Sequence, residues 1–411
     1  MIVFALLMSA SLALPVAHSQ QGKSLLESVI GEPTGNNGYE EYLMAADTLR
    51  ALGDAPEFLA IKGRVYGWEE PAMSRLESAM HFRPALDLVR AGNRKPVFIP
   101  RMDAGFERVE RFLWSIPFGE LPFAELFAFR EVGRAFEAEV YWKFSEGRTA
   151  EGTRSIVDCL TFGHNIQSGS LVHYHIGCAI ESAMFKQVEQ RLQQFSKADA
   201  NRLEQFADKV LRLPPQHQFA VKREIAHAVH FNDYMFNAFE SMLTTWNELP
   251  EAEREDLEEQ YPLLKLFPEM TLAGRERVKR RVLTFWLQLD LDLAGIFRRP
   301  ESEWELPGPP KEDAPLNAAL SDTVSTWNLS IRRAVEIRTR FRLMRLHALI
   351  IQFRWEYDRL PNSLDELKAV KAVKDPLTGG EFVYERDEGS YELYSRGNED
   401  TGRIFLTYRA I

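Results

Sequence analysis

The stretch from residue 332 to residue 357 constrains the fold most, because apolar side chains recur along it at steps of three and four. This spacing predicts an amphipathic helix. One apolar stripe consists of Ala334, Ile337, Phe341, Met344, Ala348, Ile351 and Trp355, and an adjacent one consists of Leu343, Leu346, Ile350, Phe353 and Tyr357. Together the stripes cover a wide arc, so we expect this helix to be buried on two sides.

The residues after this helix predict a small antiparallel sheet. Pro361 and Asn362 end the helix, because neither residue favours its continuation. Turn residues then separate short segments in which apolar and polar side chains alternate, as they do in half-buried strands. The expected strands cover residues 382–385, 391–395 and 404–408. We therefore expect a C-terminal α+β module over residues 317–411, with its long helix lying on the sheet.

The order of these pieces, RLPNSLDEL, then DPLTGGEFVYE, then GSYELYSRGNED, resembles the globular domain of the type II secretion major pseudopilins. Similar tails occur at the ends of large exported bacterial proteins of unknown function. Pseudopilins begin with an apolar membrane-spanning helix, whereas the equivalent helix here is internal. It carries arginines that could not lie in a bilayer, so the resemblance does not imply pilus assembly. The arginines are Arg332, Arg333, Arg338, Arg340, Arg342 and Arg345.

The same resemblance raises the question of calcium in the loop between Gly397 and Gly402. In major pseudopilins the corresponding loop holds a calcium ion, and here Asn398 and Asp400 are the candidate ligands. Calcium takes six to eight oxygen ligands, and this short loop offers few. A plain polar turn is therefore the other interpretation. No other cofactor is implied by the chain.

Residues 20–298 predict a helical body, and the Pro- and Glu-rich stretch 299–316 predicts a linker. Residues 123–146 and 150–165 are joined by a tight Gly-containing turn and resemble one tetratricopeptide-type repeat, although no second copy follows at a fixed period. The body is therefore an irregular helical bundle or a short α-solenoid. The expected helices cover residues 38–52, 70–91, 123–146, 150–165, 170–195, 197–213, 219–246, 251–261 and 272–297.

The first 19 residues predict an export signal. An apolar run ends in small residues before Ser19, and it is short for a membrane span, so we expect cleavage between Ser19 and Gln20. The mature protein would be periplasmic or secreted, without a stable transmembrane anchor. The absence of Lys or Arg before the run leaves an N-terminal membrane anchor as the alternative.

Composition and cysteine content further restrict what kind of protein this chain can be. The chain has 411 residues, 45% of them apolar, which is enough for two or more cores, and its net charge of −10 argues against nucleic-acid binding. Its two cysteines, Cys159 and Cys178, could form a disulfide or remain buried thiols. If their helices form a hairpin, the two positions are offset by about four residues, or roughly 6 Å at 1.5 Å per residue. This offset favours buried thiols.

No catalytic or metal motif is complete in the sequence. Histidines concentrate between His164 and His230, and the low-ranking catalytic candidates in this region are His173, Glu181, Glu224 and His227. Glu224, His227 and His230 follow one another at steps of three, which is not the HExxH arrangement of zinc enzymes. We therefore expect no metal ion here, and neighbouring side chains should satisfy these histidines.

Arg338, Arg342 and Arg345 repeat along one side of the long C-terminal helix and are the candidate interaction residues. We expect them to flank the contact between the C-terminal module and the body and to meet acids there. The acidic run 251–259 is either a solvated helix face or a dock for these arginines. The sequence favours an exported, non-catalytic interaction or scaffold protein of the cell envelope, with an unidentified protein partner. The alternative is a hydrolase-type enzyme with a helical active site between His164 and His230.

Overall fold

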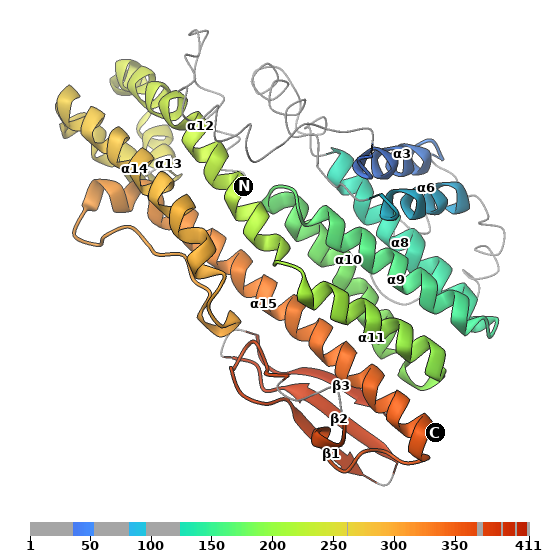
Figure 1. The fold of residues 1–411 in the computed structure, drawn as a ribbon. Coiled ribbons are helices and arrows are strands. Elements are labelled where there is room, and N and C mark those ends of the chain that lie inside the picture. Colours follow the sequence, from blue (N-terminus) through green and yellow to red (C-terminus); the bar gives the residue numbers. More distant parts are fainter. Residues whose placement is uncertain are drawn as a thin grey trace.

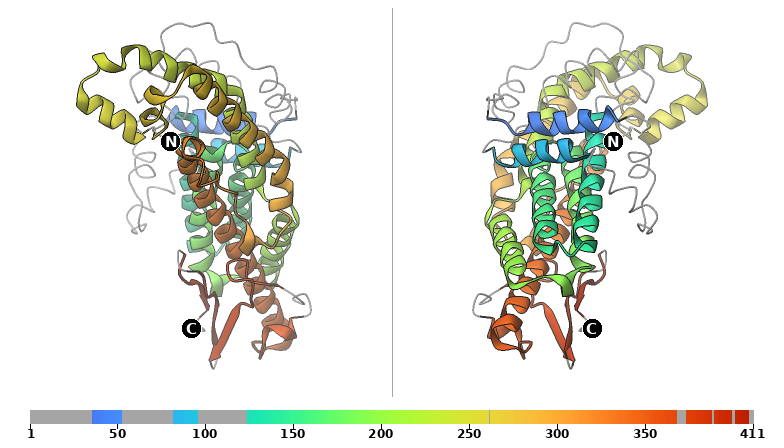
Figure 2. Two further views of the ribbon diagram at one scale, coloured as in Figure 1. Left: turned by 90° about the vertical axis from the view of Figure 1, so that its left-hand side faces the viewer. Right: turned by 90° about the vertical axis from the view of Figure 1, so that its right-hand side faces the viewer.

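A computed structural model describes residues 36–52, 82–95, 124–260, 262–367, 373–387, 389–398 and 401–408. These residues form a mainly helical structure that ends in a three-stranded antiparallel sheet, which confirms the expected fold class. The segment around α13 (Glu251–Gln260) projects at one end of the molecule, and the sheet closes the opposite end (Figure 2). The expected export signal lies outside the described residues.

The N-terminal helices of the body are α3 (Tyr39–Arg50), α6 (Arg83–Asn93), α8 (Ala124–Ser145), α9 (Thr149–Ile166) and α10 (Leu171–Glu189). They are followed by α11 (Lys197–Arg212), α12 (Gln216–Thr245), α13 and α14 (Leu272–Ile296). The last helix, α15 (Ala314–Tyr357), is the longest at 44 residues. The strands are β1 (Val383–Asp387), β2 (Ser390–Ser395) and β3 (Ile404–Tyr408).

Side-chain caps at several helix starts explain why the chain turns where it does. The Ser196 hydroxyl accepts a hydrogen bond from the Asp199 N–H, and Asp199 bonds back to Ser196, which forms a capping box at the start of α11. Thr271 accepts from Gly274 at the start of α14, and Asp313 accepts from the Leu316 N–H at the start of α15.

Helix α15 runs along the molecule and joins the body to the sheet (Figure 1). Near its start, Trp327 packs against Trp286 of α14 with ring centroids 5.0 Å apart. Further along, Phe341 packs against Phe185 of α10 at 4.9 Å, while His347 contacts Tyr391 of the sheet. The helix is therefore covered on two sides, one by the body and the other by the sheet, as its two apolar stripes predict. The last member of each stripe is an exception, since Trp355 is 61% and Tyr357 50% exposed.

The sheet has the strand order β1-β2-β3, and both pairings are antiparallel. Alternate residues of β2 and β3 face α15, and among these the Tyr391 and Tyr408 rings stack at 5.1 Å. The turn before β1 is organised by the fully buried Asp375, which accepts hydrogen bonds from the Leu377 N–H and from the hydroxyl of Ser395. The expected segments 391–395 and 404–408 are thus strands, and β3 has the predicted bounds.

Several boundaries differ from the sequence-based expectation, and two of the larger differences have a visible cause. Helix α15 begins at Ala314 rather than near residue 332, because its first half packs on α14 through residues such as Trp327. Helix α10 ends at Glu189 rather than at residue 195, although the sequence there has no Gly or Pro. The chain turns through Leu192–Gln194 so that Phe195 can pack against Phe144 at 5.9 Å.

Residues 299–313, here called the strap, connect α14 to α15 and pack closely along α15 (Figure 1). Trp304 and Leu306 of the strap are buried. The Asn328 amide of α15 donates to the Leu306 carbonyl at 3.1 Å and accepts from the Leu306 N–H at 2.8 Å. Residues expected to form a linker therefore bind to the helix that follows them.

Candidate functional site

The N-terminal end of α10 brings together two of the sequence-predicted candidates. Ser170 is the N-cap, and its hydroxyl lies 2.8 Å from His173 Nδ1 in a capping box. Glu224 reaches across from α12, and its Oε1 accepts the Leu171 N–H at 2.9 Å. Burial raises the pKa of Glu224, although the bond from Leu171 opposes this shift. Both candidate side chains therefore satisfy a helix end.

The His173 ring is also bound from its other side, where Nε2 lies 3.0 Å from the Tyr39 hydroxyl of α3. Burial, together with the nearby charge of Arg223, lowers the pKa of His173 to about 3, so the ring is neutral at ordinary pH. The Ser170 N–H donates to Nδ1 at 3.3 Å, which makes Nδ1 the acceptor. Nε2 therefore carries the hydrogen and donates to Tyr39.

Arg223 and His227 lie on the side of α12 that is turned into the molecule, four residues apart and thus on one helix face. His227 is 4% exposed and Arg223 is 6% exposed. Burial lowers the pKa of Arg223 to about 10, whereas the interaction with Tyr39 raises this pKa by a smaller amount. The sequence analysis did not select Arg223. A signal existed, since this arginine shares its helix face with Ala220, Ala226 and His227.

Glu181 lies elsewhere, two turns further along α10 and roughly 12 Å from His173 at 1.5 Å per residue. It is fully buried at the contact between α9 and α10, where the Gln167 amide donates to it. The His164 Nδ1 atom lies 3.7 Å from Glu181 Oε1. Burial raises the pKa of Glu181, while His164 opposes the shift. Glu181 is therefore separated from His173 by two helical turns and serves a different helix contact.

The remaining histidines are spread over the helix contacts. His175 Nε2 lies 2.8 Å from the Ser330 hydroxyl of α15, and the buried His217 ring packs between Tyr174 and Phe297. Within the described ranges, no three His, Cys, Asp or Glu side chains are grouped so that they could hold a metal ion. The His230 side chain lies outside the described residues. Cys159 and Cys178 are both buried free thiols.

The three candidate interaction residues of α15, Arg338, Arg342 and Arg345, bind acids that belong to the body and to the strap. Arg345 pairs with Glu204 and Asp208 of α11, at 3.2 and 2.9 Å. Arg338 and Arg342 both bind the Glu301 carboxylate of the strap, at 2.7 and 2.8 Å. These side chains are therefore engaged within the chain, where they join α15 to α11 and to the strap.

Two other acidic or oxygen-rich segments were candidates for binding. In the loop between Gly397 and Gly402, the Asn398 side-chain oxygen accepts from the Thr401 N–H at 2.9 Å, and Asp400 lies outside the described residues. The acidic run of α13 is mostly exposed, and the arginines of α15 bind other acids. The acidic run 251–259 is therefore a solvated helix face.

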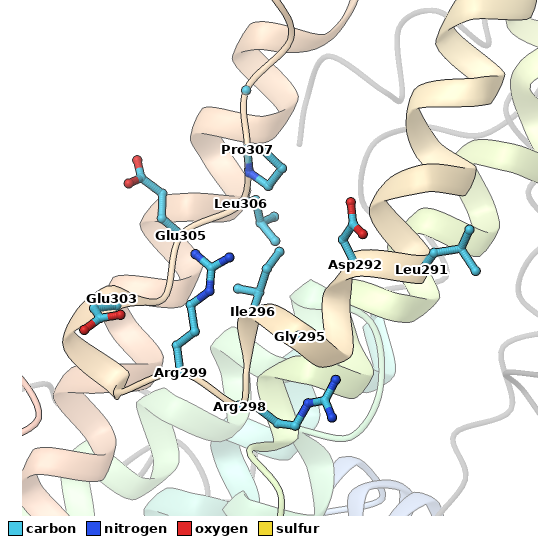
Figure 3. Close-up of a pocket in the computed structure, with 11 residues that line it drawn as sticks. Leu291, Asp292, Gly295, Ile296, Arg298, Arg299, Glu303, Glu305, Leu306 and Pro307 are labelled. Atoms are coloured by element: carbon cyan, nitrogen blue, oxygen red, sulfur yellow. The ribbon is translucent and has the colours of Figure 1, made fainter.

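A surface groove of about 900 Å³ lies between the end of α14 and the strap. Figure 3 shows Ile296 of α14 and Leu306 of the strap at its centre, with Asp292 on the α14 side and Arg299 on the strap side. Leu291 on its rim is 74% exposed. The residues that line the groove are Leu291, Asp292, Gly295, Ile296, Arg298, Arg299, Glu303, Glu305, Leu306, Pro307 and Gly308.

Comparison with known proteins does not suggest a function, so the function must be inferred from the arrangement of the residues. No protein-family model matches the chain, and neither a curated protein nor a solved structure shows significant similarity to it. In the described part of the chain, no helix combines the length and the apolar content that a bilayer crossing requires.

Proposed function

We propose that this chain is an exported, non-catalytic interaction or scaffold protein of the cell envelope that binds another protein. The observation that carries the proposal is the groove between α14 and the strap, which combines apolar and charged side chains at the surface. Its rim residue Leu291 is exposed, although most large apolar side chains in the described part of the chain are buried. Interface cores commonly combine such apolar anchors with a polar rim.

The placement of the candidate catalytic residues supports the same proposal. His173 and Glu224 complete the start of α10, and Glu181 is enclosed between α9 and α10. An enzyme needs such groups to converge on space for a substrate. Here Glu181 and His173 lie on separate turns of α10 and serve different helix contacts, which favours a structural role for both.

The C-terminal module supports a scaffold role because its long helix is packed against the body. Phe341 is 1% exposed between Phe185 and Phe206, and Arg345 adds ion pairs to α11 beside this contact. The long helix on an antiparallel sheet agrees with the arrangement that the pseudopilin resemblance implies. We propose kinship with the pseudopilin-like tails of exported proteins on this basis, with export directed by residues 1–19.

The test is site-specific photo-crosslinking in intact cells of the source organism. A crosslinking residue at Leu291 should capture one envelope protein repeatedly, and an added Arg299→Glu change should reduce that product. The matched control is Leu272, which is 68% exposed at the opposite end of the same helix. It should give little of the product. Equal products from both positions, or none from Leu291, would contradict the proposal.

A further inference from the structure

The groove between α14 and the strap has open space on both of its walls. Gly295 of α14 and Gly308 of the strap line it, and a Cβ atom added to either residue would meet nothing within 4 Å. Ile296 and Leu306 give the groove an apolar floor, and Leu291 extends this floor to the surface (Figure 3). The backbone of a partner can therefore approach both glycines closely, as it could not approach a residue with a side chain.

The strap is an extended segment where it borders the groove. Residues 304–310 belong to no helix or strand, and Trp304 has the extended backbone angles φ −71° and ψ 111°. Leu306 and Gly308 each precede a proline, and steric contact with a proline ring keeps the preceding residue in the β or polyproline II conformation. One wall of the groove is therefore an extended chain, whereas the other wall is a helix.

The backbone of the strap offers hydrogen-bonding groups to a partner. The N–H and the C=O of Leu306 are both directed towards α15, where they bind Asn328 at 2.8 and 3.1 Å. Because successive residues of an extended chain direct these groups to opposite sides, those of Glu305 point away from α15. Glu305 is exposed and lines the groove, and no hydrogen bond within the described residues uses its N–H or its C=O. An extended partner can exchange both bonds with Glu305, whereas a helix uses its own backbone groups internally.

Charges of both signs surround the apolar floor. Arg298 and Arg299 are exposed where α14 passes into the strap, and the Arg298 Nε donates to the Ala294 carbonyl at 3.1 Å. Asp292 on α14 and Glu305 on the strap are exposed acids that line the two walls. A partner complements this pattern if it carries an acidic and a basic side chain with an apolar side chain between them.

We infer that the groove binds an extended peptide segment of another protein, in which an apolar residue lies between an acidic and a basic one. This inference rests on the proposed function and specifies the partner. The segment pairs with Glu305 through two backbone hydrogen bonds, and its apolar side chain lies over Ile296 and Leu306. The groove volume of about 900 Å³ is within the range of ligand pockets in proteins.

The first test selects binders from a display library of random short peptides, with the full chain as the bait. Enriched peptides should share an apolar residue between residues of opposite charge. Fluorescence polarisation of a labelled copy of the best peptide should then show saturable binding to the full chain. Failure to enrich any peptide would overturn the inference.

Matched substitutions locate the binding site of the selected peptide. Gly295→Leu should weaken binding at least about tenfold because it fills the groove, and its Tm should not fall, since leucine favours a helix more than glycine does. Gly308→Leu fills the same space from the strap and should have the same effect on binding. Ala294→Leu is the control, because Ala294 is exposed beside Gly295 and does not line the groove. Equal binding by the wild type and both glycine variants would overturn the inference.

N-methylation of the selected peptide, one residue at a time, tests the extended pairing. Methylation of the residue that pairs with Glu305 removes one hydrogen bond and should weaken binding about two- to tenfold, whereas methylation of either neighbour should change it little. A similar loss at every position would show that the peptide binds as a helix and would overturn the inference. Capture of a protein from Leu291 in cells would, in that case, still support the proposed function. The expected methylation pattern without such capture would contradict the proposed function alone.

Discussion

Gly163 and Gly177 face each other where α9 packs on α10, and a Cβ atom on Gly177 would overlap the Gly163 carbonyl oxygen. A Cβ on Gly163 would lie 3.1 Å from the Gly177 carbonyl oxygen and 3.0 Å from the Glu181 side chain. The two glycines therefore let the helix backbones approach closely, and this approach encloses the Glu181 carboxylate.

The first prediction follows from this contact. Gly177→Ala should destabilise the protein by about 1–3 kcal/mol, because the helices must separate to admit a methyl group. The control is Gly295→Ala in α14, where an added Cβ would meet nothing within 4 Å. That change should be neutral or stabilise by up to about 1 kcal/mol through helix propensity. Urea unfolding measures both, and equal effects of the two variants would contradict the packing described.

The second prediction concerns the face of α15 that meets the body. Phe341→Asp should cost at least about 3 kcal/mol, because it leaves a cavity and buries an unpaired charge between Phe185 and Phe206. Leu329→Asp is the control on the same helix, at a residue that is 62% exposed. It should change the free energy of unfolding little. Unchanged melting of Phe341→Asp would mean that this stripe faces solvent.

The third prediction concerns pH and the strap. Burial raises the pKa of Glu301, but the charges of Arg342 and Arg338 oppose this and hold it below the ordinary value. A depressed pKa contributes stability that is complete above the unfolded pKa of about 4.3 and is lost as the pH falls through the folded pKa. Burial also lowers the pKa of Arg342, yet an arginine stays charged at these pH values.

Glu301→Gln should therefore destabilise the protein by about 1.5–3 kcal/mol at neutral pH, the value of charged hydrogen bonds. The difference from wild type should shrink below about pH 4. Glu303→Gln, at an exposed neighbour in the strap, should show neither effect. Denaturation curves across the acid range measure both variants, and a difference that persists at the lowest pH would argue against a role for the Glu301 charge.

The fourth prediction concerns export. The mature protein should begin at Gln20 and be found outside the cytoplasm, because the preceding apolar run ends in small residues that a signal peptidase accepts. N-terminal sequencing of the protein from fractionated cells checks this. A soluble cytoplasmic protein that retains Met1 would disprove the prediction.

Much of the fold could be predicted because hydrophobic periodicity is a local property. Most described helices of the body lie close to their expected ranges, although α6 begins at Arg83 where the expected helix began at residue 70, and β3 has the expected bounds. The errors occurred where a distant contact decides the boundary. Helix α10 ends early because Phe195 packs on Phe144, and α15 starts early because Trp327 packs on Trp286.

The candidate site was harder to predict, because histidines and acids look alike in sequence whether they bind ligands or fasten helices. His173 and Glu224 were selected from the sequence, but their bonds to Ser170 and Leu171 appear only when α10 and α12 meet. Arg223 was missed because its apolar neighbours along α12 suggest burial, whereas its actual burial appears only once the helices pack. That property depends on which groups other helices bring near it.

The sequence by itself determined that this chain is mainly helical, that its last long helix is buried on two sides, and that a small antiparallel sheet follows. Spacing of apolar residues and turn chemistry carry that information along a single segment. Only the tertiary structure decided that Glu301 binds Arg338 and Arg342, that the strap packs along α15, and that Glu224 of α12 binds the N-terminal end of α10. Each of these depends on residues far apart in the chain, and their energies arise from desolvation and contact geometry that no local pattern encodes.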